Sequence, residues 1–196
     1  MHDELRDDDF TVVGVALDED PDDIRPFLDG VTFPVLIDRD HLLAELYAMS
    51  NVPTVVWIDA DDRIARPNAA EVGTDIFAEF TAASADAHRR AVIEWVRRGV
   101  VPADAAHDVA DLDDDEVDAR LAFRIAVHLR RRGDDAGAGR WFARASSLAP
   151  LDFSVSRAAM PLTGRDPFGE EFLEIFEAWR GAGAPIHGLG PHRSDR

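Results

Sequence analysis

The chain has 196 residues and is 46% hydrophobic, which is enough for one large core or two smaller ones. Its net charge of -18 argues against nucleic acid and anionic membrane surfaces as partners, because both are negatively charged. It contains no cysteine, which excludes disulfides, cysteine-bound zinc and a thiolate nucleophile in this polypeptide. No apolar run approaches the ~20 residues that span a bilayer, and the acidic start resembles no signal sequence, so we expect a soluble, cytoplasmic protein.

The first third of the chain alternates apolar runs with short helical patterns. Residues 10–17 are almost continuously apolar, which predicts a strand buried on both faces, as in parallel sheets. A short helix is expected from Pro21 to about Leu28, since proline suits the first helical position. Residues 31–37 form an extended piece. A second helix is expected over residues 41–49, with these apolar residues on one face: Leu42, Leu43, Leu46 and Tyr47.

Residues 46–65 are the most informative stretch. The run Val55–Ile58 is β-branched and aromatic and too short for a helix, which predicts a buried strand. Pro53 cannot donate a hydrogen bond to a neighbouring strand, so it must lie at the start of this strand or just before it. An acidic turn over residues 59–62 then leads into an antiparallel strand that begins at Arg63.

This order of elements resembles the thioredoxin-like family, and most closely its TlpA/ResA-type and peroxiredoxin-related members. The resemblance covers about residues 1–67 and includes the Val-Val-Gly-Val strand, the Phe-Pro segment, the Val-Pro-Thr turn and the strand hairpin. In that family the turn proline has a cis peptide bond, which Val52–Pro53 can adopt at a cost of about 0.5–1 kcal/mol. The family usually has glycine where this chain has Asp62, and aspartate tolerates the same left-handed geometry.

The resemblance also implies a binding site. In thioredoxin-like proteins the residue before the cis proline uses its backbone to dock an extended segment, a form of β-strand addition. The corresponding residues here are Val52, Pro53 and Thr54. Without a thiolate, this surface could bind a peptide but could not exchange a disulfide, so we expect no catalytic residues in this chain.

One part of the family pattern is missing. The first βα unit, which carries the Trp-Cys-x-x-Cys-type motif, would precede Met1, and its strand would lie between the strands expected at 10–17 and 55–59. Without it those strands must pair directly or leave a gap. Three explanations stay open: a start codon upstream, a degenerate paralogue without activity, or a partner chain that completes the sheet.

The second half of the chain is predicted to be helical. A helix is expected over residues 84–98, with Ser84 as its N-cap and Gly99 as its C-cap, and a linker over residues 100–115. The acidic run 113–116 is typical of a helix start. Its spacing does not fit a calcium-binding loop, because Glu116 stands where that loop has glycine.

Residues 119–152 resemble a tetratricopeptide repeat (TPR), a helical hairpin of 34 residues. Its signature positions are occupied by these residues: Ile125, Ala126, Leu129, Ala138, Phe142, Ala145 and Pro150. Ala122 departs from the signature, which usually has a large residue there. One repeat cannot bury its own apolar face, so it must pack on residues 84–98, on residues 153–160 or on the thioredoxin-like part.

Together these patterns predict an α/β fold: a truncated thioredoxin-like sheet with flanking helices, followed by a helical region. The expected domains are residues 1–82, residues 83–182 with the hairpin at 119–152, and a flexible tail at 183–196. An amphipathic helix is expected over residues 169–180.

No other constellation predicts chemistry. The histidines are scattered, no Gly-x-Ser-x-Gly elbow or phosphate-binding loop is present, and nothing in the sequence positions a carboxylate pair. We therefore expect no metal and no cofactor, and a protein or peptide as partner. The predicted function is that of a thioredoxin-like redox-family protein, related to thiol-disulfide oxidoreductases and peroxiredoxins but inactive as written. The alternative is a non-catalytic protein–protein interaction module that uses the TPR-like hairpin.

Overall fold

The computed structural model describes residues 1–47, 49, 52–69, 84–106, 109–110, 112–183 and 186–187. It is a mixed α/β structure with two compact units that interleave along the chain. In the described part, the strand unit comprises Met1–Arg39 and Pro53–His107, and the helical unit comprises Asp40–Val52 and Asp108–Gly190. The sequence predicts contiguous domains at 1–82 and 83–182 instead, because local patterns do not reveal that a short segment leaves one unit to pack in the other.

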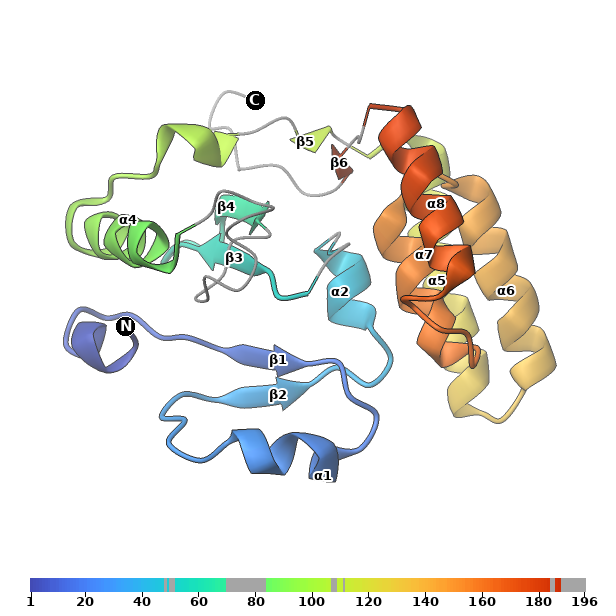
Figure 1. Cartoon of the computed structure of the whole chain (residues 1–196), viewed down its shortest axis with the longest axis horizontal. Coiled ribbons are helices and arrows are strands. Elements are labelled where there is room, and N and C mark those ends of the chain that lie inside the picture. Colours follow the sequence, from blue (N-terminus) through green and yellow to red (C-terminus); the bar gives the residue numbers. More distant parts are fainter. Residues whose placement is uncertain are drawn as a thin grey trace. The chain divides into compact units, whose positions relative to one another are not determined.

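The strand unit begins with a 3-10 turn, η1 (Asp3–Leu5), followed by the strand β1 (Gly14–Ala16). A short helix α1 (Pro21–Ile24), extended by the 3-10 turn η2 (Arg25–Phe27), leads to the strand β2 (Val35–Ile37). β1 and β2 pair in parallel (Figure 1). The predicted helix over 21–28 is confirmed, whereas the regular strand is shorter than the apolar run 10–17 suggested.

The β-hairpin lies where the sequence predicts it. The strand β3 (Val55–Ile58) pairs antiparallel with β4 (Ile64–Ala69). The Asp59 carboxylate Oδ1 accepts hydrogen bonds from the backbone N–H groups of Asp61 (2.9 Å) and Arg63 (3.0 Å), which closes the turn. Asp62 has a φ of 58°, so an aspartate does adopt the left-handed conformation at this position.

The helix α4 (Ala85–Arg98) completes the strand unit. The Ser84 hydroxyl caps its first turn and Gly99, with a φ of 68°, ends it, as predicted. The core of the unit gathers around Leu5, Trp57 and Val92. Trp57 stacks on Trp95 with ring centroids 4.9 Å apart, which fixes α4 against the hairpin. A further 3-10 turn, η3 (Ala103–Ala106), lies in the segment predicted as a linker.

The strands of the strand unit form two separate two-stranded sheets, β1–β2 and β3–β4. The sequence left direct pairing of the strands at 10–17 and 55–59 open; in the described part of the chain β1 and β3 do not pair and belong to separate two-stranded sheets. A third small pair belongs to the helical unit: β5 (Val109–Ala110) runs parallel to β6 (Ile186–His187). β6 falls in the segment predicted as a flexible tail, whose remaining residues lie largely outside the described part.

The helical unit contains α2 (Leu42–Leu46), α5 (Asp114–Arg131), α6 (Asp135–Leu148), α7 (Phe153–Leu162) and α8 (Glu170–Gly181) (Figure 1). The predicted acidic cap is confirmed, since Asp113 and Glu116 form a reciprocal capping box at the start of α5. α5 and α6 form the predicted helical hairpin, with Gly133 in the left-handed turn between them. Its core consists of these residues: Ala122, Phe123, Ala126, Val127, Ala138, Phe142, Ala145, Val155, Ala158, Ala159 and Leu162.

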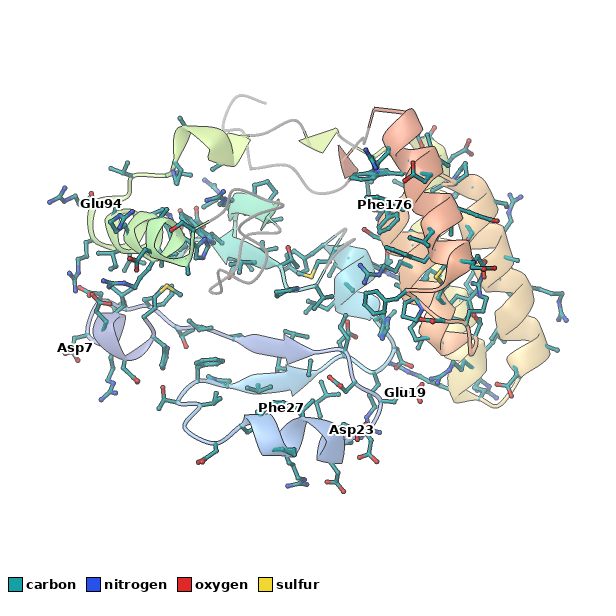
Figure 2. All side chains as sticks on the ribbon, viewed as in Figure 1. Asp7, Glu19, Asp23, Phe27, Glu94 and Phe176 are labelled. Carbon is teal, nitrogen blue, oxygen red and sulfur yellow. The ribbon has the colours of Figure 1, made fainter. Side chains whose placement is uncertain are left out.

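The hairpin buries its apolar face on α7, which is the second of the three options that the sequence left open. Most residues of α7 are buried on all sides, as expected of a helix at the centre of a bundle. α8 adds an aromatic cluster in which the ring of Phe153 lies 5.3 Å from Phe172 and 6.0 Å from Phe176. Figure 2 labels Phe176 on α8.

Acidic side chains cover much of the described surface. Figure 2 shows Asp7, Glu19 and Asp23 pointing away from the ribbon, and all three are exposed. Phe27, also labelled there, is 79% exposed beside α1. In the described part of the chain, no helix is long and apolar enough to cross a membrane.

Candidate functional site

The three predicted binding residues lie at the entrance to β3. Val52 is 56% exposed, and Pro53 and Thr54 are half-buried. Pro53 stands two residues before Val55, the first residue of β3, as its missing N–H requires. Val52 is the last residue of the segment that belongs to the helical unit, and Pro53 is the first that belongs again to the strand unit. By this division Val52 belongs to the helical unit, and Pro53 and Thr54 belong to the strand unit.

A buried charge cluster in the helical unit was not predicted. Glu45 on α2 is 0% exposed, Arg120 on α5 is 6% exposed, and Asp152, which precedes α7, is 3% exposed. Arg120 Nη2 lies 2.7 Å from Asp152 Oδ2, and Arg120 Nε lies 3.9 Å from Glu45 Oε1. These contacts lie off the hydrogen-bond directions, so charge rather than hydrogen-bond geometry holds the three groups together. The Arg120 guanidinium thus pairs with two buried carboxylates, those of Glu45 and Asp152.

The remaining polar atoms of the cluster have their own partners. Arg120 Nη1 donates a hydrogen bond to the backbone carbonyl oxygen of Glu116, at 3.1 Å. Arg124 Nε donates to Glu45 Oε2 at 3.3 Å. Asp152 is also the N-cap of α7, because its Oδ1 accepts from the backbone N–H groups of Ser154 (3.0 Å) and Val155 (3.4 Å). The cluster therefore fixes α2, α5 and the start of α7 to one another.

Two further arginines, Arg130 and Arg131, bind Asp40, which lies two residues before the start of α2. Arg131 Nε donates to Asp40 Oδ2 at 2.6 Å, and Arg130 Nη1 lies 3.6 Å from Asp40 Oδ1. Between the two anchors, His41 is buried and has a φ of 54°, which is unusual for a residue other than glycine. Such a left-handed residue costs about 1–2 kcal/mol, so the contacts on either side of it must offset this strain.

Burial raises the pKa of Glu45 above its ordinary value of 4.5. Arg124 and Arg120 lower the pKa in part, and the neighbouring charge of Asp152 raises it further. The charges of two carboxylates and two guanidinium groups balance when all four are ionised. With three of these side chains shielded from solvent, the cluster is suited to holding elements in place rather than to acting on a substrate.

The sequence carried a weak signal for this cluster. Glu45 interrupts the apolar run Leu-Leu-Ala-Glu-Leu, and Arg120 lies among the buried positions Ala119, Ala122 and Phe123. A charge at an apolar position indicates a buried partner, since charged side chains are almost never fully buried unless they are paired. The sequence could not show which carboxylates meet, because the three residues are 75 and 32 positions apart along the chain.

Within the described residues, no three His, Asp or Glu side chains come together as a set that could hold a metal ion. No protein-family model, no curated protein and no solved structure matches this chain. The case for a function therefore rests on the residues and geometry described above.

Proposed function

We propose that this chain is a thioredoxin-like relative that binds an extended peptide without thiol chemistry. The peptide would dock against the backbone of Val52, with Pro53 and Thr54 shaping the turn. The absence of cysteine removes the nucleophile that disulfide exchange requires. What remains of the family's machinery is a backbone surface that can recognise an extended segment.

The observation that carries this proposal is the proline-entered hairpin. Pro53 precedes β3, the acidic turn places Asp62 in the left-handed conformation, and β4 returns antiparallel. The parallel pair β1–β2, connected through α1, supplies the preceding elements in the order that the resemblance requires. Val52 itself is 56% exposed.

A peptide-binding experiment tests the proposal. Random seven-residue peptides displayed on phage would be selected on the whole chain, and the affinity of the selected peptides would be measured by fluorescence anisotropy. Val52→Pro removes the backbone N–H and should abolish binding, whereas the matched control Val52→Ala changes only the side chain and should keep it. Selected peptides that bind Val52→Pro as well as the original chain would disprove docking on this backbone.

A second candidate function uses the helical unit as the interaction module. The observation in its favour is a spacing: α8 begins 35 residues after α6 begins and ends 33 residues after α6 ends, close to the 34-residue period of a TPR. Phe176 also follows Phe142 by 34 positions. This pattern supports a second, less regular helical pair, α7–α8, stacked on the first. Such arrays bind partners on extended helical surfaces.

The same phage selection separates the two functions. Phe168, just before α8, is 70% exposed, and Leu173 on α8 is 53% exposed. If the helical unit binds the partner, Phe168→Asp with Leu173→Asp should abolish binding while Val52→Pro has no effect. If the turn binds it, the two results are reversed.

A further inference from the structure

The outer side of α5 carries a ridge of exposed apolar side chains. Val117 is 43% exposed, Leu121 is 49% exposed and Ile125 is 39% exposed. They are spaced four residues apart, so on a helix they lie one above the other along a single ridge. The residues that α5 buries in the helical unit, such as Phe123 and Ala126, lie on the opposite side of the helix. Three large apolar side chains on one ridge are therefore in contact with solvent.

Acidic side chains flank this ridge near its start, and basic side chains flank it near its end. Asp114 and Asp118 belong to the first half of α5, Arg124 and His128 belong to the second half, and all four are exposed. With about 100° of rotation per residue, all four lie within about 60° of Leu121 around the helix axis. We call this surface the α5 face, and it consists of these residues: Asp114, Val117, Asp118, Leu121, Arg124, Ile125 and His128.

The α5 face is complementary to itself when it is turned end over end about Leu121. Asp118 lies three residues before Leu121, and Arg124 lies three residues after it. Val117 and Ile125 lie four residues before and after it. Two copies of α5 that cross antiparallel at Leu121 would therefore place Asp118 of each copy opposite Arg124 of the other, with the apolar ridges between them.

The outer residues of the face follow the same symmetry. Asp114 and His128 lie seven residues before and after Leu121, so they too meet across an antiparallel crossing. A parallel arrangement would instead place each charge beside its own copy, where like charges repel. Because a twofold interface requires that residue i contacts j and that j contacts i, this pattern favours a second copy of the chain over an unrelated partner.

We propose that the α5 face is the interface of a homodimer, in which α5 of one copy crosses α5 of a second copy antiparallel at Leu121. Ridges of residues spaced four apart pack into each other at a crossing angle of about −50°. The charges on either side of the ridge then fix the orientation of the pair more than they strengthen it.

The charge of the whole chain supports the choice of this surface. A net charge of -18 on each copy opposes self-association, so two copies can meet only on a face that is not itself strongly acidic. The α5 face carries two acidic and two basic side chains. An arginine has five N–H donors, so Arg124 can bind Glu45 through Nε and the partner's Asp118 through its Nη atoms. This inference does not depend on either proposed peptide-binding surface.

Sedimentation velocity of the whole chain tests the proposal. The concentration series should reach about 1 mM, because an interface of this size is smaller than that of a standard stable complex. We expect a reversible monomer–dimer equilibrium. A chain that stays monomeric over the whole series would overturn the inference, and so would continued growth beyond the dimer, because a twofold interface closes on itself.

The first variant places a charge on the twofold axis. In Leu121→Glu two carboxylates face each other at the crossing, and the dimer should be lost. The matched control is Leu173→Glu on α8, because Leu173 is similarly exposed at 53% and lies in the same unit. It should dimerise like the original chain. Far-UV circular dichroism checks that both variants keep their helices. A Leu121→Glu chain that dimerises as well as Leu173→Glu would show that the interface lies elsewhere.

A charge reversal tests the antiparallel orientation without changing the apolar ridge. Asp118→Arg brings two arginines together at each end of the crossing, and it should weaken dimerisation by about tenfold or more. Asp115→Arg makes the same change of net charge, but Asp115 lies about 120° around the helix from Leu121, so this control should not weaken dimerisation. Equal dimerisation of the two variants would contradict the antiparallel crossing.

Discussion

In the helical unit, Phe123 and Phe142 pack edge to face, 5.2 Å apart, inside a continuous core that draws on α5, α6 and α7. In the strand unit, the buried centre consists of Leu5, Trp57 and Val92, and the strands form separate pairs. Helices satisfy their backbone hydrogen bonds internally, whereas a two-stranded sheet needs a third strand or a packed face to be stable. We therefore expect the helical unit to resist unfolding more strongly than the strand unit.

The largest effect is expected from opening the helical core. Phe142→Ala should lower the free energy of unfolding of the helical unit by about 3–5 kcal/mol, because it leaves a cavity at a site that is 1% exposed. Urea unfolding followed by far-UV circular dichroism measures this. Trp141→Ala, at the adjacent and 39% exposed position, is the matched control and should change the stability far less. Equal losses in the two variants would contradict the core described here.

A loss of similar size should follow from removing the shared cation of the charge cluster. Arg120→Met should destabilise the chain by about 3–5 kcal/mol, because it leaves Glu45 and Asp152 buried without their common partner. Arg165→Met is the control: it breaks an ion pair with Glu171 in which both side chains are exposed, and we expect a loss of at most about 1 kcal/mol. If both variants unfold at the same urea concentration as the original chain, the cluster does not hold the unit together.

The free energy of unfolding should depend on pH because Glu45 titrates. Because burial raises its pKa, the folded chain binds more protons than the unfolded chain as the pH rises above the ordinary value of 4.5. The stability that the raised pKa of Glu45 contributes is fully present below pH 4.5, and it is lost as the pH rises through the pKa of Glu45 in the folded chain.

Unfolding free energies of the original chain and Glu45→Gln, measured between pH 4 and pH 7, isolate this effect, because the two chains differ only at this carboxyl group. The original chain should lose stability relative to Glu45→Gln as the pH rises. A difference that stays constant, or that changes in the opposite direction, would show that the arginines outweigh burial at Glu45.

The smallest effect is expected in the hairpin turn of the strand unit. Asp62 has a φ of 58° and an exposed side chain, so replacing it with glycine removes left-handed strain. Asp62→Gly should raise stability by roughly 0.5–1 kcal/mol after the greater flexibility of unfolded glycine is subtracted. Asp62→Ala should lower it. Thermal unfolding followed by tryptophan fluorescence, in a background with Trp141→Phe and Trp179→Phe, leaves Trp57 and Trp95 as the reporters on this unit. A lower melting temperature for Asp62→Gly would refute the strain argument.

The comparison also shows which features can be read from sequence. Helix ends were predictable, because the Ser84 cap, the Asp113–Glu116 box and Gly99 act within a few residues. The hairpin β3–β4 was predictable for the same reason, since its turn chemistry is local. The helix α7 was not predicted as an element, because it is only ten residues long and contains Pro161, a residue that disfavours the interior of a helix.

Contacts between residues that are far apart in the chain could not be predicted from the sequence. Three residues far apart in the chain make the charge cluster, and nothing near Glu45 reveals Arg120 or Asp152 as its partners. The assignment of α2 to the helical unit depends on the same contacts, so the sequence instead predicted that this helix belongs with the strands around it. Pro53 was placed at the entrance of β3 from local chemistry, because proline cannot donate to a neighbouring strand, whereas the binding role expected of Val52, Pro53 and Thr54 comes only from the family resemblance.

Native-state hydrogen exchange of the whole chain tests the central claim most directly: that α2 belongs energetically to the helical unit although its neighbours in sequence belong to the strand unit. The amides of Glu45 and Tyr47, which donate to the carbonyls of His41 and Leu43, report on α2. We predict that they exchange with the same opening free energy as α5 and α7, and more slowly than the amides of β1 and β2. Exchange of α2 together with β1 and β2 would contradict the account.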